Sequence, residues 1–118
     1  MASRDPADLL PLKSDVLHIM LALTGRPMHG YGIIRHVEEY SEGAVLLQTG
    51  ALYRTLRRLL GDGVIDESAA PDGEQAADER RRYYRLTRFG QAVLDAEVSR
   101  MAKLVRVARL AARQSGPA

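Results

Sequence analysis

Cysteine and tryptophan are absent from this sequence of 118 residues, and phenylalanine occurs once. Without cysteine, the chain cannot contain a disulfide framework, a thiol nucleophile or a zinc site with cysteine ligands. No apolar run is long enough to cross a membrane, so we expect no membrane partner. The opening residues, MASRDPADLL, include two acids and a proline but no apolar stretch, which argues against a secretory signal. These absences predict a cytoplasmic protein with one small domain.

Signatures of catalysis and of metal binding are also sparse. The histidines are His18, His29 and His36. His29 and His36 are seven residues apart, whereas a helical metal pair needs the i, i+4 spacing. The sequence HGYG at 29–32 lacks the GxGxxG spacing of a phosphate-binding loop. We therefore expect neither an enzyme nor a bound metal or other cofactor.

The net charge of +2 conceals a strong asymmetry along the chain. Residues 1–40 carry 4 basic and 5 acidic side chains, residues 41–79 carry 3 and 8, and residues 80–118 carry 10 and 2. A strongly basic last third indicates a surface for nucleic acid or for an acidic membrane. An arginine-rich, solvated helix face is the alternative interpretation of the same composition.

Hydrophobic periodicity predicts a mainly helical chain with one small β-hairpin. Ser14, Thr49 and Thr87 are expected to cap helices, because their side chains can accept hydrogen bonds from the first helical turn. The predicted helices span residues 14–23, 30–40, 50–60 and 87–112, and the strands of the hairpin span residues 64–68 and 81–86. A further short strand is expected at residues 44–47.

This order of elements describes a winged helix-turn-helix followed by one long helix, and it predicts DNA binding. A helix about 10–12 Å wide fits the major groove of DNA, which is about 12 Å wide. The start of the third helix is rich in small residues, so its backbone amides can approach a phosphate closely. The residues that this helix is expected to present to DNA are Thr49, Gly50, Ala51, Tyr53, Arg54 and Arg57.

A cluster of arginines, Arg80, Arg81 and Arg82, lies where the predicted hairpin loop ends. In a wing, such side chains reach phosphates or a neighbouring minor groove. Strand alternation would send Arg81 to one face and Arg82 to the other. We therefore expect two of the arginines to contact DNA, and at least one of the cluster to pair with a local acid such as Asp78 or Glu79.

The last predicted helix carries an apolar seam. Its apolar residues recur with the alternating spacing of a heptad repeat. They are Leu94, Val98, Met101, Val105 and Ala108. A helix of about 25 residues is roughly 37 Å long, which is more than a small three-helix core can cover. A second copy of the chain is the simplest partner for the rest of the apolar side, so we expect a homodimer.

Four stretches of the chain resemble, in order and spacing, the motifs of the PadR-like transcriptional regulators. They are PMHGYGI at 27–33, TGALY at 49–53, LLGDGVI at 59–65 and YYRLTRFG at 83–90. The resemblance covers about residues 10–112, and the single terminal helix is similar to that of the short-tailed subgroup. It implies a winged helix-turn-helix DNA-binding domain over residues 10–86 and a dimerisation helix over residues 87–113.

The resemblance also implies a function and a set of site residues. It implies a homodimeric repressor that binds a dyad-symmetric operator, with the third helix in the major groove and the wing against the DNA backbone. The positions that match the start of the third helix are Thr49, Gly50, Ala51 and Tyr53. The positions that match the turn before the second helix, near a phosphate, are His29, Gly30 and Tyr31.

The chain departs from the family pattern at two positions of these motifs. Arg54 stands where many relatives have proline, and Leu60 stands where many have glutamate. Two alternatives remain beside DNA-dependent regulation alone: a small-molecule effector bound between the terminal helices near Met101, and a winged helix that contacts another protein instead of DNA. Acids paired with Arg54, Arg57 and the wing arginines would favour the protein-contact alternative.

Overall fold

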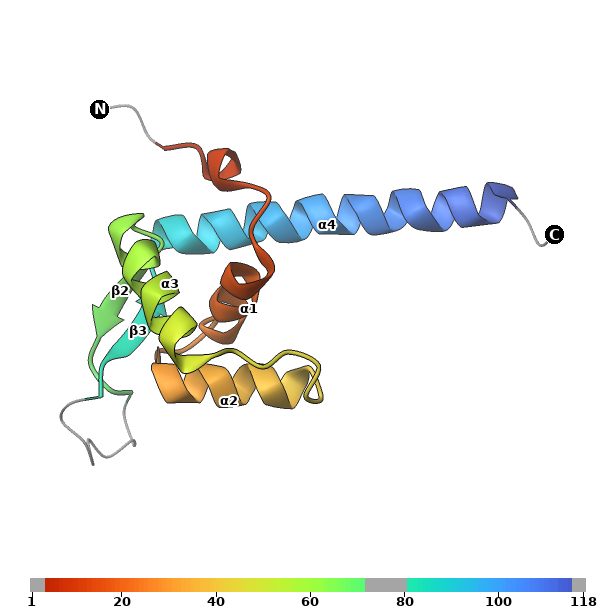
Figure 1. Cartoon of the computed structure of the whole chain (residues 1–118). Helices are drawn as coiled ribbons and strands as arrows, with labels where there is room; N and C mark the ends of the chain where they lie inside the picture. Colours follow the sequence, from red (N-terminus) through yellow and green to blue (C-terminus); the bar gives the residue numbers. More distant parts are fainter. Residues whose placement is uncertain (1–3, 72–80, 116–118) are drawn as a thin grey trace.

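The computed structural model describes residues 4–71 and 81–115, and it consists of helices with a small antiparallel sheet at one side (Figure 1). In chain order, the elements are the 3-10 helix η1 (Pro6–Leu9), α1 (Ser14–Ala22), β1 (Met28–His29), α2 (Gly30–Tyr40), α3 (Thr49–Gly61), β2 (Ile65–Ser68), β3 (Tyr83–Leu86) and α4 (Arg88–Ser115). The predicted fold class, mainly helical with a small hairpin and a long terminal helix, is confirmed.

Helix caps agree with the sequence expectation at only one of three positions. Thr87 precedes α4, and its Oγ1 accepts a hydrogen bond of 2.9 Å from the Gly90 amide. Ser14 and Thr49 are instead the first residues of α1 and α3. The capping positions belong to Lys13 and Gln48, and neither forms a side-chain capping bond. The expectation of caps at Ser14 and Thr49 is therefore wrong by one residue.

The sheet has three strands within the described residues, in the order β1-β3-β2. β2 pairs with β3 as predicted, with Ile65 opposite Leu86 and Ser68 opposite Tyr83. The two-residue strand β1 was not predicted, because two residues are too few to show alternation. The strand expected at 44–47 is wrong: this segment is irregular, and its side chains at Val45 and Leu47 pack against the core without strand pairing.

The core lies between α1, α2, α3, the sheet and the first turns of α4 (Figure 1). α1 supplies its centre, since Ile19 and Met20 are fully buried. Tyr84 is also buried, as is Tyr83, whose ring packs edge-on against His29 with a centroid distance of 5.3 Å. The aromatic strand residues Tyr83 and Tyr84 are therefore packing groups of the hairpin.

α4 joins the winged-helix core through direct backbone packing. A Cβ at Gly90 would lie 1.9 Å from the Val64 carbonyl oxygen, so only glycine permits this approach. The Thr87 amide donates to the same Val64 oxygen at 3.1 Å, and Thr87 Oγ1 donates to the Gly63 carbonyl at 2.6 Å. The start of α4 and the turn before β2 consequently form one rigid joint.

A buried carboxylate attaches the N-terminal segment to α4. Glu97 is 1% exposed, and its Oε2 accepts a hydrogen bond of 2.8 Å from the Leu12 amide, while its Oε1 accepts one of 2.5 Å from Arg100 Nε. The Arg100 bond lowers the pKa of the Glu97 carboxyl; burial opposes this effect, and the Leu12 bond adds to it. Glu97 therefore remains a carboxylate although its side chain is buried.

The second half of α4 extends away from the core (Figure 1). Leu94, the first residue of the predicted seam, is buried within the chain's own core, as is Val93. From Val98 to Ser115 every residue is exposed, including the seam residues Met101, Val105 and Ala108. No helix among the described residues is long and apolar enough to cross a membrane.

Candidate nucleic-acid interface

The exposed side of α3 is cationic and carries no opposing charge. α3 contains no acidic residue, and the side chains of Arg54, Arg57 and Arg58 are exposed. Within residues 4–71 and 81–115, none of these three arginines forms an ion pair. Thr49 and Gly50 are also exposed, and Ala51 is half-buried. The opposite side of α3 is buried through Leu52, Leu56 and Leu59, which fixes the cationic side outward.

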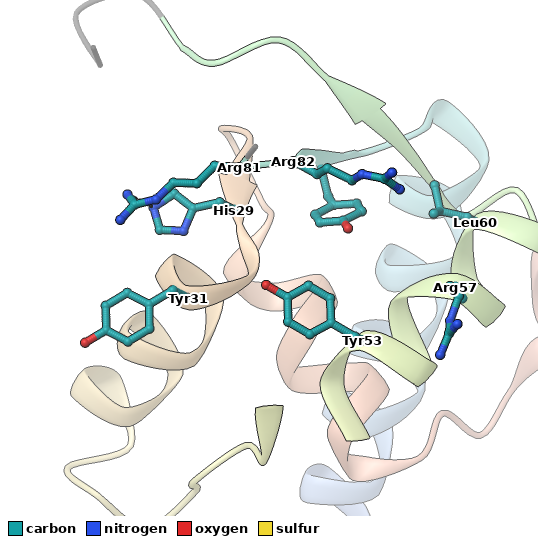
Figure 2. A pocket seen from close by; sticks show the side chains of 8 residues that line it. His29, Tyr31, Tyr53, Arg57, Leu60, Arg81 and Arg82 are labelled. Atoms are coloured by element: carbon teal, nitrogen blue, oxygen red, sulfur yellow. Dashed lines mark hydrogen bonds between the residues drawn. The ribbon is translucent and has the colours of Figure 1, made fainter. Parts of the chain in front are cut away.

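Tyr53 connects α3 with the start of α2. Its ring lies against Gly30, where a Cβ would be 2.6 Å from the tyrosine hydroxyl oxygen. Tyr53 is nevertheless 43% exposed, so part of the ring and the α3 surface around it face solvent. The absence of a side chain at Gly30 thus allows the predicted contact residues of α2 and α3 to share one surface (Figure 2).

His29 caps α2 with its imidazole. Nδ1 accepts a hydrogen bond of 3.0 Å from the Gly32 amide. A neutral ring whose Nδ1 accepts must carry its proton on Nε2, so Nε2 is a donor. That nitrogen lies 3.4 Å from Nη1 of Arg81, which is also a donor, and Figure 2 shows the two side chains next to each other. Two adjacent donors suit an anionic oxygen that accepts from both.

The wing arginines take different positions. β3 begins at Tyr83, so Arg81 and Arg82 precede the strand, and the expected strand alternation does not apply to them. Arg82 forms an ion pair of 3.3 Å with Glu67 on β2. Pairing of one wing arginine with an acid is confirmed, but the partner comes from the opposite strand. Arg80 and the acids that were expected to pair, Asp78 and Glu79, lie outside the described residues.

An open hollow of about 530 Å³ separates α3 from the wing and the start of α2 (Figure 2). Its lining residues are His29, Tyr31, Tyr53, Arg57, Leu60, Arg81, Arg82 and Tyr84. Burial raises the pKa of the Tyr84 phenol, and the neighbouring Tyr53 and Glu67 raise it further. Every predicted contact element thus borders this hollow, and the Tyr84 phenol, whose pKa is raised, stays neutral at physiological pH.

A second hollow of about 350 Å³ also borders His29, and it is lined by arginines that were not predicted as contact residues. Arg26 and Arg35 line it together with Arg81. The guanidinium of Arg35 lies 5.9 Å from the centre of the Tyr31 ring, and Nη2 is 3.9 Å from a carboxylate oxygen of Glu39. The spacing of Tyr31 and Arg35, four residues apart on a helix, could have indicated this neighbour.

Metal chemistry has no visible basis in the part of the chain that the structure describes. Among those residues, no group of three histidine, aspartate or glutamate side chains is placed to hold a metal ion. His18 instead pairs with the Tyr40 hydroxyl at 2.5 Å, which connects α1 to α2. The chemistry of the cationic surface on α3 and the wing is that of hydrogen-bond donors and positive charge.

In comparison with protein families, the chain matches the transcriptional regulator PadR-like family over residues 16–96. This range includes α2, α3, the hairpin and the first turns of α4. No curated protein sequence matches the chain.

Solved structures of similar fold include several regulators. A PadR family transcription regulator from Clostridium difficile is 25% identical, with a TM-score of 0.67 over 80% of this chain and 94% of that one. RosR from H. salinarum is 26% identical, with a TM-score of 0.62 over 92% of this chain and 97% of that one. Bacillus subtilis PadR in complex with operator DNA is 20% identical, with a TM-score of 0.60 over 73% of this chain and 47% of that one, and it shows likeness of fold.

Proposed function

Because the chain belongs to the transcriptional regulator PadR-like family, we propose that it binds a specific operator as a homodimer and represses transcription there. The members of this family are transcriptional regulators. The specific proposals for this chain are the operator contacts, the dimer and the repressor role. Residues 10–86 bind DNA, and residues 87–113 hold the two copies together.

The observation that carries the proposal is the cationic surface shared by three elements. α3 presents Arg54 and Arg57 without ion-pair partners among the described residues, and Arg81 lies beside the start of α2. Unpaired arginines on one surface are what phosphate binding requires, because each neutralised phosphate releases condensed counterions. A surface for protein contact would gain more from paired or apolar groups, so the arrangement favours DNA.

Each group has a proposed role on the duplex. The first turn of α3, from Thr49 to Ala51, enters the major groove with its amides close to the DNA backbone. Arg54 and Arg57 read guanine edges, the commonest specific contact of an arginine in the major groove. His29 and Arg81 donate to one phosphate oxygen, which sets the register of α2 on the backbone. Tyr31, Tyr53 and Arg82 add phosphate contacts around the hollow.

The dimer is proposed from the exposed apolar side of α4. Val98, Met101, Leu104 and Val105 are between 39% and 53% exposed, in a helix that spans Arg88–Ser115. Such a continuous apolar surface marks a site of association. A second α4 covers it, which places two copies of α3 about 34–36 Å apart, one turn of DNA. Repression follows when the dimer occupies a promoter.

A fluorescence-anisotropy titration tests the function. The labelled duplexes are the DNA upstream of the protein's own gene and a scrambled version, each at two salt concentrations. We expect at least about a thousand-fold preference for the first duplex, with a salt slope that reports the number of phosphates engaged. Absence of binding to either duplex at low salt would overturn the proposal in favour of a protein-contact module.

Sedimentation equilibrium tests the dimer, with Met101→Glu as the variant. Burying a charge in an apolar interface is unfavourable, so the variant is expected to sediment as a monomer while its helical content is retained. A wild-type protein that sediments as a monomer at micromolar concentration contradicts the dimer proposal.

We further propose that a small-molecule effector binds between the terminal helices near Met101. The affinity of the protein for the operator should then change when that small molecule is added.

A further inference from the structure

Gln48 occupies a position in the fold where a different kind of residue is expected. It is the N-cap of α3, with extended backbone angles φ −80° and ψ 135°, yet its side chain makes no capping hydrogen bond. N-caps are commonly serine, threonine, aspartate or asparagine, because a short side chain can reach the amides of the first turn. The longer side chain of Gln48 therefore contributes little to the start of α3.

The amide of Gln48 also has no other structural role. The residue is exposed, and within residues 4–71 and 81–115 its side chain forms no hydrogen bond. Its neighbours on the surface are Thr49 and Gly50, which are exposed as well, and Arg54, whose Nη1 would be 3.7 Å from a Cβ at Gly50. The carboxamide of Gln48 thus presents its NH2 donor and its carbonyl acceptor to solvent at the N-terminal end of the cationic side of α3.

We infer that Gln48 reads an adenine in the major groove of each half-site. The inference rests on the proposed function, because it requires α3 to lie in that groove. In helix-turn-helix proteins, residues at the N-terminus of the recognition helix contact base edges. The carboxamide of glutamine pairs in two places with adenine, donating to N7 and accepting from the N6 amino group. Guanine presents two acceptors at the same edge, so the amide cannot pair with both.

The distance from Gln48 to Arg54 limits where this adenine lies. Six residues of α-helix span about 9 Å, and base pairs are stacked about 3.4 Å apart. A guanine read by Arg54 therefore lies within about three base pairs of the adenine. The inference thus specifies a short element of the half-site, an adenine and a guanine at close and fixed separation.

Selection of bound duplexes from a randomised pool tests this assignment. The wild type, Gln48→Ala and Gln48→Lys are compared, with Gln114→Ala as the matched control at the far end of α4. We expect the wild type to enrich one adenine per half-site, with a preference of about 5- to 140-fold over other bases. Gln48→Ala should lose the preference at that base pair alone. Gln48→Lys should shift it toward guanine, whose O6 and N7 accept from an ammonium group.

The outcomes separate this inference from the proposed function. A wild-type motif that is unchanged in Gln48→Ala overturns the assignment while the regulator proposal stands. A uniform loss of affinity without a change of motif makes Gln48 a phosphate contact and also overturns it. A wild type that enriches no motif overturns the proposed function, and the assignment fails with it. Thermal unfolding of each variant checks that the fold is retained.

Discussion

The hydroxyl of Tyr53 in α3 lies so close to Gly30, the first residue of α2, that a Cβ at position 30 would be 2.6 Å from the oxygen. The first residue of α2 therefore packs against the ring of Tyr53 and fixes its position on α3. Tyr53 is partly exposed, and it borders the hollow that also contains Arg57 and Arg81. The position of this ring shapes the surface that we assign to DNA.

Gly30→Ala is expected to impair DNA binding more than folding. The atoms that must move belong to the far end of the Tyr53 side chain, so we expect a stability cost within about 1–3 kcal/mol, the usual range for inserting a methyl group. The displaced Tyr53 ring leaves its place in the hollow and loses its proposed phosphate contact, so we expect a lower affinity for the operator. Anisotropy and thermal unfolding measure the two effects. In a Tyr53→Ala background, Gly30→Ala should change affinity little; an equal loss in both backgrounds would contradict the coupling.

Arg57→Ala and Arg81→Ala are expected to separate base contact from phosphate contact. Loss of Arg57 should weaken the operator complex by about 1–3 kcal/mol, with a smaller effect on random duplex. Loss of Arg81 should weaken both complexes alike and reduce the salt slope by about 1. Titrations at several salt concentrations give both quantities. Equal losses on the two duplexes for Arg57→Ala would make it a phosphate contact, and an unchanged slope for Arg81→Ala would exclude its phosphate role.

Glu67→Gln is expected to increase affinity for any duplex. In the free protein, Glu67 holds Arg82 at 3.3 Å, and this exposed pair must open before Arg82 can reach a phosphate. Exposed pairs contribute about 0.2–1 kcal/mol, so the gain should be roughly up to five-fold. Asp66→Asn, at the neighbouring exposed acid, controls for the loss of a negative charge near DNA. The same gain in both variants would mean that the Arg82 pair has no special part.

Glu97→Gln is expected to destabilise the fold near neutral pH and to have a smaller effect in acid. The pKa of Glu97 is lowered in the folded chain, chiefly by the hydrogen bond from Arg100. Its contribution to stability is therefore complete above the ordinary glutamate pKa, about 4.3, and is lost as the pH falls through the lower, folded-state value. Denaturation at pH 7 should show a loss of about 1.5–3 kcal/mol, which is typical of a hydrogen bond to a charged group. A loss that does not shrink in acid would contradict this account.

Gly90→Ala is expected to be the most damaging of the small substitutions. The new methyl group would meet the Val64 carbonyl, a backbone atom that cannot rotate away, so a cost of about 3 kcal/mol or more is expected. Gly61→Ala is the matched control: it lies at the end of α3 with no atom within 4 Å of the added group. It should leave stability unchanged or raise it by up to about 1 kcal/mol. Chemical denaturation distinguishes the two variants.

The sequence was sufficient to predict the helices and the hairpin, because long periodic segments show their buried face directly. The span of α2 was predicted at both ends, and the helix predicted at 50–60 differs from α3 by one residue at each end. β1 escaped prediction because its two residues become a strand only by pairing with β3. The segment at 44–47 looked like a strand because it is apolar, yet no strand pairs with it there.

The candidate site was predicted as a set of residues but not as an arrangement. Motif and charge indicated His29 and Arg81 separately, whereas the cap on Gly32 and the 3.4 Å contact depend on β1 meeting β3. Glu97 gave no signal at all, since its partner Leu12 is 85 residues away and donates through the backbone. Leu94 followed the heptad repeat, but the rigid joint at the start of α4 places it in the core.

The contact of Gly90 with the Val64 carbonyl has a consequence for the DNA itself. This backbone contact leaves no hinge between the DNA-binding core that carries α3 and the helix α4. In the proposed dimer, the two copies of α3 therefore keep a fixed orientation relative to each other. One base pair added between the half-sites turns one of them by about 34–36° relative to the other. The protein has no flexible linker at this joint to follow that rotation. If the chain binds its operator as the proposed dimer, we therefore expect its affinity to depend on the number of base pairs between the half-sites as well as on their sequence.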